Sequence, residues 1–317
     1  MSPERENDGT APAGDGTSPV DPETLVHPAF RPDPSLSRAE METLQRDIAA
    51  TAVFEDDHGL DPAAVAIDEP ADLADGLPAT RPDAGDPDAP VVVGIDQAFR
   101  TTGDGSMAED GSTADDGGPN GDGTFDEAVS AAVAVRDGAV IEYASAATPL
   151  SIPYVPGLLA FREGGPMLAA LDALDAEPDL LVCDGSGRIH FREAGVATHV
   201  GVLRDVPSVG VAKSLLCGEP AASVDGRPAG WRTPIRADES VETTGTVTDD
   251  TPVLGYAFQS RQYPNSRRVN PLYVSPGHRV SPETTVDLVE ALCAGYKLPE
   301  PTRIADAYAD VAKREER

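Results

Sequence analysis

Short apolar runs bounded by polar or glycine-rich residues predict the strands of this chain. Such runs occur at 91–96, 180–184, 206–211, 252–258 and 272–275. A run of about four to eight apolar residues between turn residues is typical of a strand buried in a sheet. The first two runs each end in an aspartate. We therefore expect a buried sheet that carries carboxylates at the ends of two strands.

A hairpin and three helices complete the predicted core. The apolar stretches 128–135 and 140–146 flank an Arg-Asp-Gly turn, which is typical of two antiparallel strands. Apolar residues at helical spacing predict a helix at 161–174 and another that runs from Ser281, a candidate N-cap, to about residue 294. A capping-box spacing starts a third helix at 37–50.

An early hairpin followed by alternating strands and helices predicts one α/β domain with a mixed sheet flanked by helices. The domain spans about 35–300, and polar segments flank or interrupt it. We assign these segments as a disordered acidic tail at 1–34, an acidic connector at about 55–90, a loop insertion at about 101–125, an irregular stretch at 219–250 and a C-terminal extension at 301–317.

The overall charge is strongly acidic. The chain has 24 Lys and Arg against 55 Asp and Glu, a formal net charge of −31, which would ordinarily argue against a nucleic-acid partner. Three of the 24 basic residues are lysines, so 21 are arginines. A lysine-poor, aspartate-rich surface is typical of adaptation to very high salt, where the Debye length falls to about 3 Å at 1 M. The net charge therefore indicates the salt content of the surrounding solution and says little about which ligand the protein binds.

The sequence lacks the features of membrane, secreted and disulfide-rich proteins. No run reaches the ~18 apolar residues of a membrane span, and the Met1 end lacks the basic-then-apolar order of a signal peptide. Cys183, Cys217 and Cys293 are too few and too scattered for a disulfide framework or a zinc cluster. We expect a soluble, cytoplasmic protein with no membrane partner, and a monomer.

Acidic residues are missing from two segments of this acidic chain, 143–162 and 251–282. The first holds Tyr154 between prolines, and the second combines tyrosines with arginines. Its arginines are Arg261, Arg267, Arg268 and Arg279. Arginine supplies phosphate contacts and tyrosine a stacking face or wedge, a pairing suited to distorted nucleic acid. The alternative is that both segments are simply buried, although the polar composition of 261–270 argues against burial there.

Three carboxylates are candidates for a metal site. Asp96 and Asp184 each close an apolar strand, and Glu163 lies near the start of the predicted helix between them. Functional groups gather at strand ends in open α/β sheets, and Mg²⁺ or Mn²⁺ prefers carboxylates and water. The alternative is that each aspartate only caps a turn.

Other motifs leave the chemistry open. The turn at 184–187 matches neither the dinucleotide nor the Walker pattern, so its glycines serve either a close approach beside Asp184 or an ordinary turn. Taken alone, His190 and His199 favour structural roles over catalytic ones. His278 lies between a predicted strand and a helix N-terminus, where a side chain is often presented to solvent. No Ser/His/Asp or H-E-x-x-H motif occurs.

Taken together and in order, seven motifs resemble the endonuclease V family over about residues 36–294. They are Gly-Ile-Asp at 94–96, Pro-Tyr-Val-Pro-Gly at 153–157, Phe-Arg-Glu at 161–163, Asp-Gly-Ser-Gly-Arg-Ile-His at 184–190, Gly-Val-Ala-Thr-His at 195–199, Val-Gly-Val-Ala-Lys at 209–213 and Val-Ser-Pro-Gly-His-Arg at 274–279. The resemblance implies a ribonuclease H-like fold. It also implies a metal-dependent endonuclease that cuts the second phosphodiester bond 3′ to deoxyinosine, leaving a 3′-hydroxyl and a 5′-phosphate.

The resemblance also implies roles for single residues. Asp96, Glu163 and Asp184 would form the metal site, with Mg²⁺ as the cofactor and Mn²⁺ as the alternative. His190, Lys213 and His278 would lie near the scissile phosphate. The wedge and the pocket for the flipped base would comprise Pro153, Tyr154, Val155, Pro156, Gly157, Leu159, Gly185 and, again, His190.

Elementary chemistry agrees with these roles and leaves three alternatives. A lysine such as Lys213 can steady charge on a phosphate, and His278 could move a proton. A ribonuclease that recognises inosine in RNA would use the same pocket. A lesion-binding protein without cutting activity would have no use for three converging acids. A ribonuclease H-like resolvase or transposase-type nuclease would prefer branched substrates.

Overall fold

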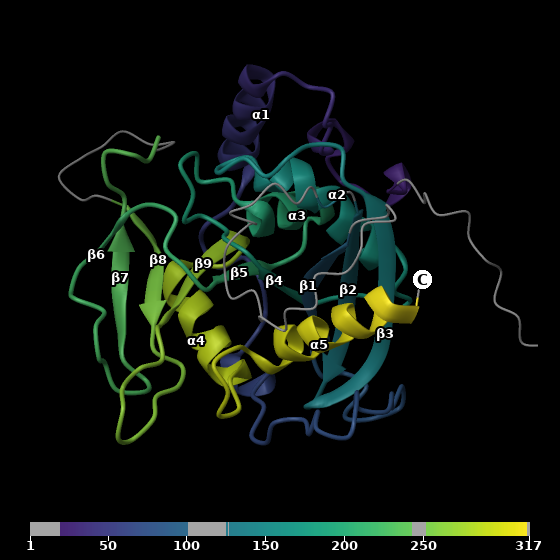
Figure 1. Cartoon of the computed structure of the whole chain (residues 1–317), viewed down its shortest axis with the longest axis vertical. Helices are drawn as coiled ribbons and strands as arrows, with labels where there is room; N and C mark the ends of the chain where they lie inside the picture. The colour runs from purple at the N-terminus through teal and green to yellow at the C-terminus, as the bar shows by residue number, and fades with distance from the viewer. Residues whose placement is uncertain (1–19, 101–124, 126, 243–251, 316–317) are drawn as a thin grey trace, which may run out of the picture.

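The computed structural model describes residues 20–100, 125, 127–242 and 252–315, and it is built around one mixed sheet (Figure 1). In these residues the sheet has nine strands in the order β3-β2-β1-β4-β5-β9-β8-β7-β6. The strands are β1 Val92–Arg100, β2 Glu127–Arg136, β3 Ala139–Pro149, β4 Leu180–Asp184, β5 Ser208–Ala212, β6 Glu219–Pro220, β7 Arg232–Arg236, β8 Val253–Phe258 and β9 Leu272–His278. Because β1, β4 and β5 are parallel, they finish at one side of the sheet, here called its carboxyl end.

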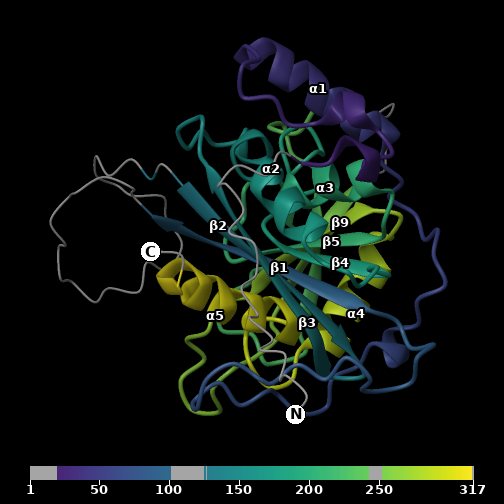
Figure 2. The same ribbon diagram turned by 90° about the vertical axis from the view of Figure 1, so that its right-hand side faces the viewer.

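Helices cover both faces of the sheet (Figure 2). Helices α2 and α3 pack on one face, α4 and α5 pack on the other, and α1 lies outside α3. Their bounds are α1 Arg38–Thr51, α2 Leu159–Asp172, α3 Val196–Arg204, α4 Pro282–Leu292 and α5 Glu300–Glu315. Short 3-10 helices occur at Pro22–Thr24, Pro28–Phe30 and Pro62–Ala64. This architecture confirms the predicted α/β class with a ribonuclease H-like mixed sheet.

Two local predictions are confirmed in detail. The Ser37 side chain accepts from the Glu40 amide, and the Glu40 carboxylate accepts from the Ser37 amide, so the capping box starts α1. The hairpin turn between β2 and β3 places Asp137 and Gly138 at φ values of 48° and 72°, as a two-residue turn of the hairpin type requires.

The core begins earlier than the sequence suggests. Residues 20–34, assigned to a disordered tail, pack on the domain: Val20 and Leu25 are buried in the core between the sheet and helices α2 and α3. The Val26 amide donates to the Leu203 carbonyl at 2.8 Å. The Asp21 amide and the Thr24 hydroxyl also donate to the Asp172 carboxylate, so apolar and polar contacts together anchor this segment. The remaining tail, 1–19, and nearly all of the 101–125 insertion lie outside the described residues.

Four elements were not predicted from the sequence: helices α3 and α5, and strands β6 and β7 within the stretch 219–250 that was expected to be irregular. Helix α3 is buried on all sides, so it lacks the amphipathic pattern that reveals a helix. Strand β7 is short, and its central residue is Pro234, which weakens a strand prediction. Helix α5 lies almost wholly in the presumed C-terminal extension, and its seven buried residues include three alanines and two polar residues. In the described part of the chain, no helix is long and apolar enough to cross a membrane.

Helix α5 lies directly on β1. A Cβ on Gly94 would come within 2.1 Å of the Pro301 carbonyl carbon, so only glycine permits this approach. Glu300 is buried and pairs with Arg303 at 2.7 Å, while its carboxylate also accepts from the Ala71 amide at 3.0 Å. The connector, although irregular as predicted, therefore fastens the start of α5 against the sheet.

Candidate active site

The two predicted strand-end aspartates are neighbours where the parallel pairing of β1 with β4 ends. Asp184 closes β4, whereas β1 continues past Asp96 to Arg100, so Asp96 lies within its strand and not at its end. Ile95 of β1 pairs with Cys183 of β4 in parallel register, so Asp96 and Asp184 follow side by side. Side chains alternate along a strand. Both aspartates therefore share the face of Val92 and Val182, on which α4 and α5 pack.

Asp96 is the most deeply buried member of the pair. Its side chain is 4% exposed, and its Oδ1 accepts from the Gln97 amide at 2.6 Å. Its Oδ2 is buried and has no hydrogen-bond partner among the described residues. Burial, followed by the nearby Asp184 and Asp306 carboxylates, raises the pKa of Asp96 well above its usual range. The Lys213 ammonium opposes this rise without cancelling it, so positive charge compensates the buried carboxylate only in part.

Glu163 joins the cluster from helix α2. Its side chain is 12% exposed, and burial raises its pKa to about 8; Arg162 opposes this shift and Asp184 adds to it. The Arg162 Nε lies 3.8 Å from the Glu163 carboxylate. The side-chain Nε2 of Gln97 donates to the Glu163 backbone carbonyl at 3.0 Å, which ties this turn of α2 to β1.

Two further charged groups complete the cluster. Lys213 directly follows β5, and its Nζ lies 3.6 Å from the Asp184 carboxylate. Asp306 projects from α5, where burial and the Asp184 carboxylate raise its pKa while Lys213 lowers it. Asp306 was not among the site residues predicted from the sequence. The signal was the small-residue stripe of Ala305, Ala309 and Ala312, which predicts a helix face packed on the sheet.

The donor set fits a hard divalent cation. Among the described residues, no three Asp, Glu, His or Cys side chains stand at the spacing of a formed metal site. Nevertheless, Asp96 has a buried oxygen without a partner, and the pKa values of Asp96 and Glu163 are raised. A cation would satisfy that oxygen and favour the ionised carboxylates. Oxygen-only donors of this kind suit Mg²⁺ or Mn²⁺.

The predicted wedge is an irregular loop between β3 and α2. Tyr154 at its tip is 50% exposed, and few large hydrophobic side chains in the described residues are exposed to this extent. Val155 instead packs inward with Leu158 and Phe161. Pro153 and Pro156 flank Tyr154 and Val155, and Leu159 starts α2. The loop is therefore attached to the domain through Val155 and exposes the Tyr154 ring at its tip.

Gly157 and His190 join this loop to the loop after β4. Gly157 has φ +78°, and a Cβ there would come within 2.9 Å of the Phe191 ring. His190 is buried, its Nδ1 accepts from the Arg192 amide at 3.1 Å, and its Nε2 donates to the Gly157 carbonyl at 3.2 Å. Burial lowers the pKa of His190 to about 4, so the ring is neutral. Its position supports a place in the pocket wall and not at a phosphate.

Gly185 separates Asp184 from that wall. Its φ is +131°, a Cβ would come within 2.6 Å of the Val196 side chain, and its amide donates to the Val211 carbonyl at 3.0 Å. The position therefore requires glycine, and it brings the loop after β4 close beside the carboxylates.

Three of the four predicted phosphate ligands lie at the carboxyl end of the sheet. Arg261, Arg267 and Arg268 belong to the β8–β9 connection, whose strand β9 starts opposite the end of β5. Arg267 and Arg268 are exposed. Arg261 stacks on Tyr263 and Tyr296, with its guanidinium 5.0 and 5.4 Å from the two ring centroids. These residues share one end of the sheet with Lys213.

His278 and Arg279 lie at the opposite end, so the structure does not bring them to the cluster. His278 pairs with Ser208, the first residue of β5, and its ring lies between the Val53 amide, 3.2 Å away, and the Asp205 carboxylate, 3.0 Å away. Arg279 pairs with Asp57 at 3.2 Å and with Asp205. Their predicted catalytic and phosphate roles are corrected accordingly, because β9 runs antiparallel to β5 and finishes at the wrong end.

Comparisons with known proteins agree with this geometry. The family profile described as Endonuclease V matches residues 116–307. A Halobacterium salinarum protein named Endonuclease V is 56% identical over 90% of this chain and 98% of its own. The crystal structure of a Streptomyces avermitilis Endonuclease V is 29% identical, covers 89% of this chain and 95% of its own, and superposes with a TM-score of 0.59. A Ciona intestinalis Endonuclease V, crystallised with DNA containing an inosine followed by a ribo-adenosine, is 23% identical, covers 88% of this chain and 98% of its own, and has a TM-score of 0.59.

Proposed function

The chain belongs to the endonuclease V family, and from that premise we propose that it nicks DNA at deoxyinosine. The proposed cut is the second phosphodiester bond 3′ to the lesion, leaving a 3′-hydroxyl and a 5′-phosphate. The observation that carries the proposal is the meeting of Asp96, Glu163 and Asp184 with Lys213 at the end of the sheet where the parallel strands finish.

Asp96, Glu163 and Asp184 would hold Mg²⁺, with Mn²⁺ as a substitute. A bound divalent ion lowers the pKa of an attacking water and neutralises charge on the phosphate. Lys213, 3.6 Å from Asp184, would hold a phosphate oxygen and steady the charge that develops there. Asp306 adds a fourth carboxylate, which strengthens the local preference for a cation.

Recognition would take place beside the cluster. The exposed Tyr154 ring would fill the gap left in the base stack. The backbone around Gly157 and Gly185 would contact the flipped hypoxanthine, with Leu159 as an apolar wall. The inosine-containing DNA in the crystals of the Ciona protein supports this choice of ligand.

Contacts to the flanking phosphates would come from Arg261, Arg267 and Arg268. The logarithm of the affinity that such contacts provide falls linearly with the logarithm of the salt concentration. The acidic composition and the Halobacterium relative both indicate a high-salt cytoplasm. Binding would therefore depend on the pocket and the wedge more than on phosphate contacts.

The direct test is nicking of an end-labelled duplex with one deoxyinosine, beside an undamaged duplex, in multimolar KCl with Mg²⁺. Asp184→Ala protein is the matched control. We expect one cut at the second bond 3′ to the lesion, absent from the variant and from reactions with EDTA.

Other outcomes would replace the proposal. Cleavage confined to matching inosine RNA would make the protein a ribonuclease. Binding of inosine DNA in Ca²⁺ without any cutting in Mg²⁺ would make it a recognition protein. Preference for branched DNA over the inosine duplex would indicate a resolvase-type nuclease.

A further inference from the structure

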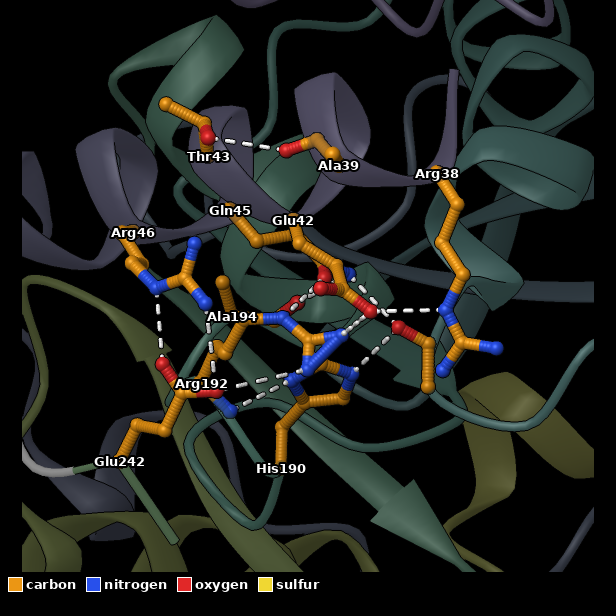
Figure 3. Close-up of polar contacts among 11 residues, drawn as sticks. Arg38, Ala39, Glu42, Thr43, Gln45, Arg46, His190, Arg192, Ala194 and Glu242 are labelled. Carbon is orange, nitrogen blue, oxygen red and sulfur yellow. Dashed lines mark hydrogen bonds and ion pairs between the residues drawn. The ribbon is translucent and has the colours of Figure 1, made fainter. Parts of the chain in front are cut away.

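A buried polar network lies behind the two loops of the proposed pocket, and the cutting reaction has no direct use for it (Figure 3). It joins helix α1 to the wedge loop, here residues 153–157, and to the loop after β4, here residues 185–195. Its centre is Gln45, which is 0% exposed, and Arg192, which is 6% exposed. Polar side chains buried to this degree are retained only where their bonds are made.

Gln45 uses both ends of its amide. The nitrogen donates to the Gly157 carbonyl at 3.0 Å and to the Ala194 carbonyl at 3.5 Å. The oxygen accepts from the Arg192 Nε at 3.0 Å. The opposite amide orientation would set oxygen against two carbonyls and nitrogen against a guanidinium, so the network dictates this one. A single side chain thus ties the last residue of the wedge loop to the end of the loop after β4.

Arg192 extends the network to the rim. Its guanidinium pairs with Glu42 at 3.1 Å and lies 4.0 Å from Glu242. Glu242 in turn pairs with Arg46 at 2.8 Å, and both side chains of this outer pair are about half exposed. Glu42 and Glu242 therefore balance the buried charge of Arg192, and the bond from Arg192 to the Gln45 oxygen fixes the orientation of the Gln45 amide (Figure 3).

The Gly157 carbonyl is the point on which these contacts converge. It accepts from the Gln45 amide and from His190. Gly157 has a positive φ, and glycine has the widest choice of backbone conformations. Two donors on one carbonyl therefore fix the most adaptable residue of the wedge loop.

We propose that Gln45 and Arg192 are positioning residues that hold the wedge loop and the loop after β4 at the separation needed to distinguish inosine from an undamaged base. The inference rests on the proposed function and deepens it. The two residues act on substrate discrimination and leave the cutting step to the carboxylate cluster. Because both are buried, salt screens their contacts little.

Gln45→Glu and Gln45→Met test the inference. The first keeps an acceptor for Arg192 and sets a carboxylate oxygen against the Gly157 carbonyl. The second removes all three bonds with a side chain of similar length, and it keeps the test usable if the buried charge of the first prevents folding. Arg46→Gln is the matched control, since it alters the next residue of the same helix and breaks only the exposed outer pair.

We expect both Gln45 variants to raise the KM for the inosine duplex about tenfold. Both lose the bond to the Gly157 carbonyl, which holds the wedge loop, and one buried hydrogen bond has an effect of this order. The maximal rate should stay within about threefold. The ratio of nicking rates on inosine and undamaged DNA should fall to about a tenth of the wild-type ratio. A 2-aminopurine placed next to the lesion should report less unstacking when DNA is bound in Ca²⁺. Arg46→Gln should match the wild type in all four.

The inference is overturned if folded Gln45 variants discriminate as well as Arg46→Gln does. A fall in maximal rate with unchanged KM and unchanged 2-aminopurine signal also overturns it, because the network would then act on chemistry. Wild-type protein that fails to nick inosine DNA would instead reject the proposed function, together with the inference that depends on it.

Discussion

Two buried polar clusters lie beside the proposed pocket, and they differ in how many of their buried polar atoms have hydrogen-bond partners. In the carboxylate cluster, the Oδ2 of Asp96 has no hydrogen-bond partner among the described residues, and the pKa of Glu163 is raised to about 8. In the network of helix α1, every polar atom of the Gln45 side chain has a partner within 3.5 Å. Both clusters are polar and both are buried, so polarity and burial alone do not distinguish them.

The degree of satisfaction separates a ligand site from a structural support. Carboxylates held together without a cation destabilise the folded chain, and they are kept where a ligand restores the balance. A saturated network has no capacity left for a ligand and instead fixes the backbone around it. The same contrast explains why Asp306 belongs with the first cluster while His190, neutral and fully bonded, belongs with the second.

The largest expected effect comes from removing one charge of the carboxylate cluster. Asp96→Asn should lower nicking by about a thousandfold or more, since several kcal/mol of metal assistance is lost and each 1.36 kcal/mol is tenfold. In EDTA the variant should unfold at the same or a higher temperature, because a neutral amide replaces a carboxyl whose pKa burial raises. Nicking assays and thermal melts of the same preparation measure both effects.

Either of two results would break the contrast between the clusters. Nicking within tenfold of wild type would remove Asp96 from the reaction. A large loss of stability in EDTA would show that the carboxylate supports the fold as Gln45 does.

A smaller loss is expected from Lys213→Ala. Loss of one group that stabilises transition-state charge lowers turnover about a hundredfold, whereas binding of inosine DNA in Ca²⁺ should stay largely intact. Lys297→Ala is the matched control, since Lys297 lies between α4 and α5. A loss of binding as large as the loss of rate would contradict the assigned role.

The two aspartates of this site were predictable from the apolar runs that they close. Asp96 and Asp184 each close an apolar run, and runs that pair in parallel bring their ends together, so their meeting follows from local sequence. Glu163 was a candidate because it lies near a helix start between the two aspartates in sequence, whereas the role of Lys213 came from the family resemblance. The structure brings both close to Asp184.

The rest depends on contacts that local sequence does not encode. Asp306 lies on helix α5, whose buried residues include Ile304 and three alanines, and alanine side chains are too small to mark a buried helix face strongly. His278 ends strand β9 and Arg279 follows it, but the end of the sheet at which a strand finishes depends on its pairing partner. Gln45 lies 112 residues from Gly157, and only the packing of α1 on the domain brings them together.

The pH dependence of stability should sharpen the contrast. Without metal, folded Glu163 keeps its proton up to about pH 8, whereas its ordinary pKa is 4.5. The folded state therefore binds more protons than the unfolded state between these values, and its stability falls as pH rises, by at most about 1.4 kcal/mol per unit for this group. Urea unfolding in EDTA and in Mg²⁺ measures the slope, which metal should reduce.

Glu163→Gln supplies the control for that slope. With no titrating carboxyl at this position, stability in EDTA should depend less on pH between 4.5 and 8. An unchanged slope would assign the effect to other groups.

The buried histidines should give a slope of the opposite sign. Burial lowers the pKa of His190 and of His199 from 6.5 to about 4. The unfolded chain then binds more protons between these values, so stability falls as pH falls, by up to about 1.4 kcal/mol per unit for each histidine. His199→Gln, which lies outside the pocket and can still donate to the Phe30 carbonyl, should remove about half of this slope. A slope that His199→Gln leaves unchanged would contradict the assignment.

The smallest effect on nicking is expected at the far end of the sheet. The His278 ring accepts from the Val53 amide and contacts the Asp205 carboxylate. It therefore holds three segments of the chain together at the end of the sheet opposite the carboxylate cluster. His278→Leu should lower the free energy of unfolding by about 1–3 kcal/mol, the effect of leaving buried polar groups unpaired, and leave nicking at 25 °C within twofold. His278→Gln, which can replace both contacts, should recover most of that stability. A tenfold loss of nicking in a His278→Gln protein of normal stability would return the residue to the catalytic group, and the opposite ends of this sheet would then share one reaction.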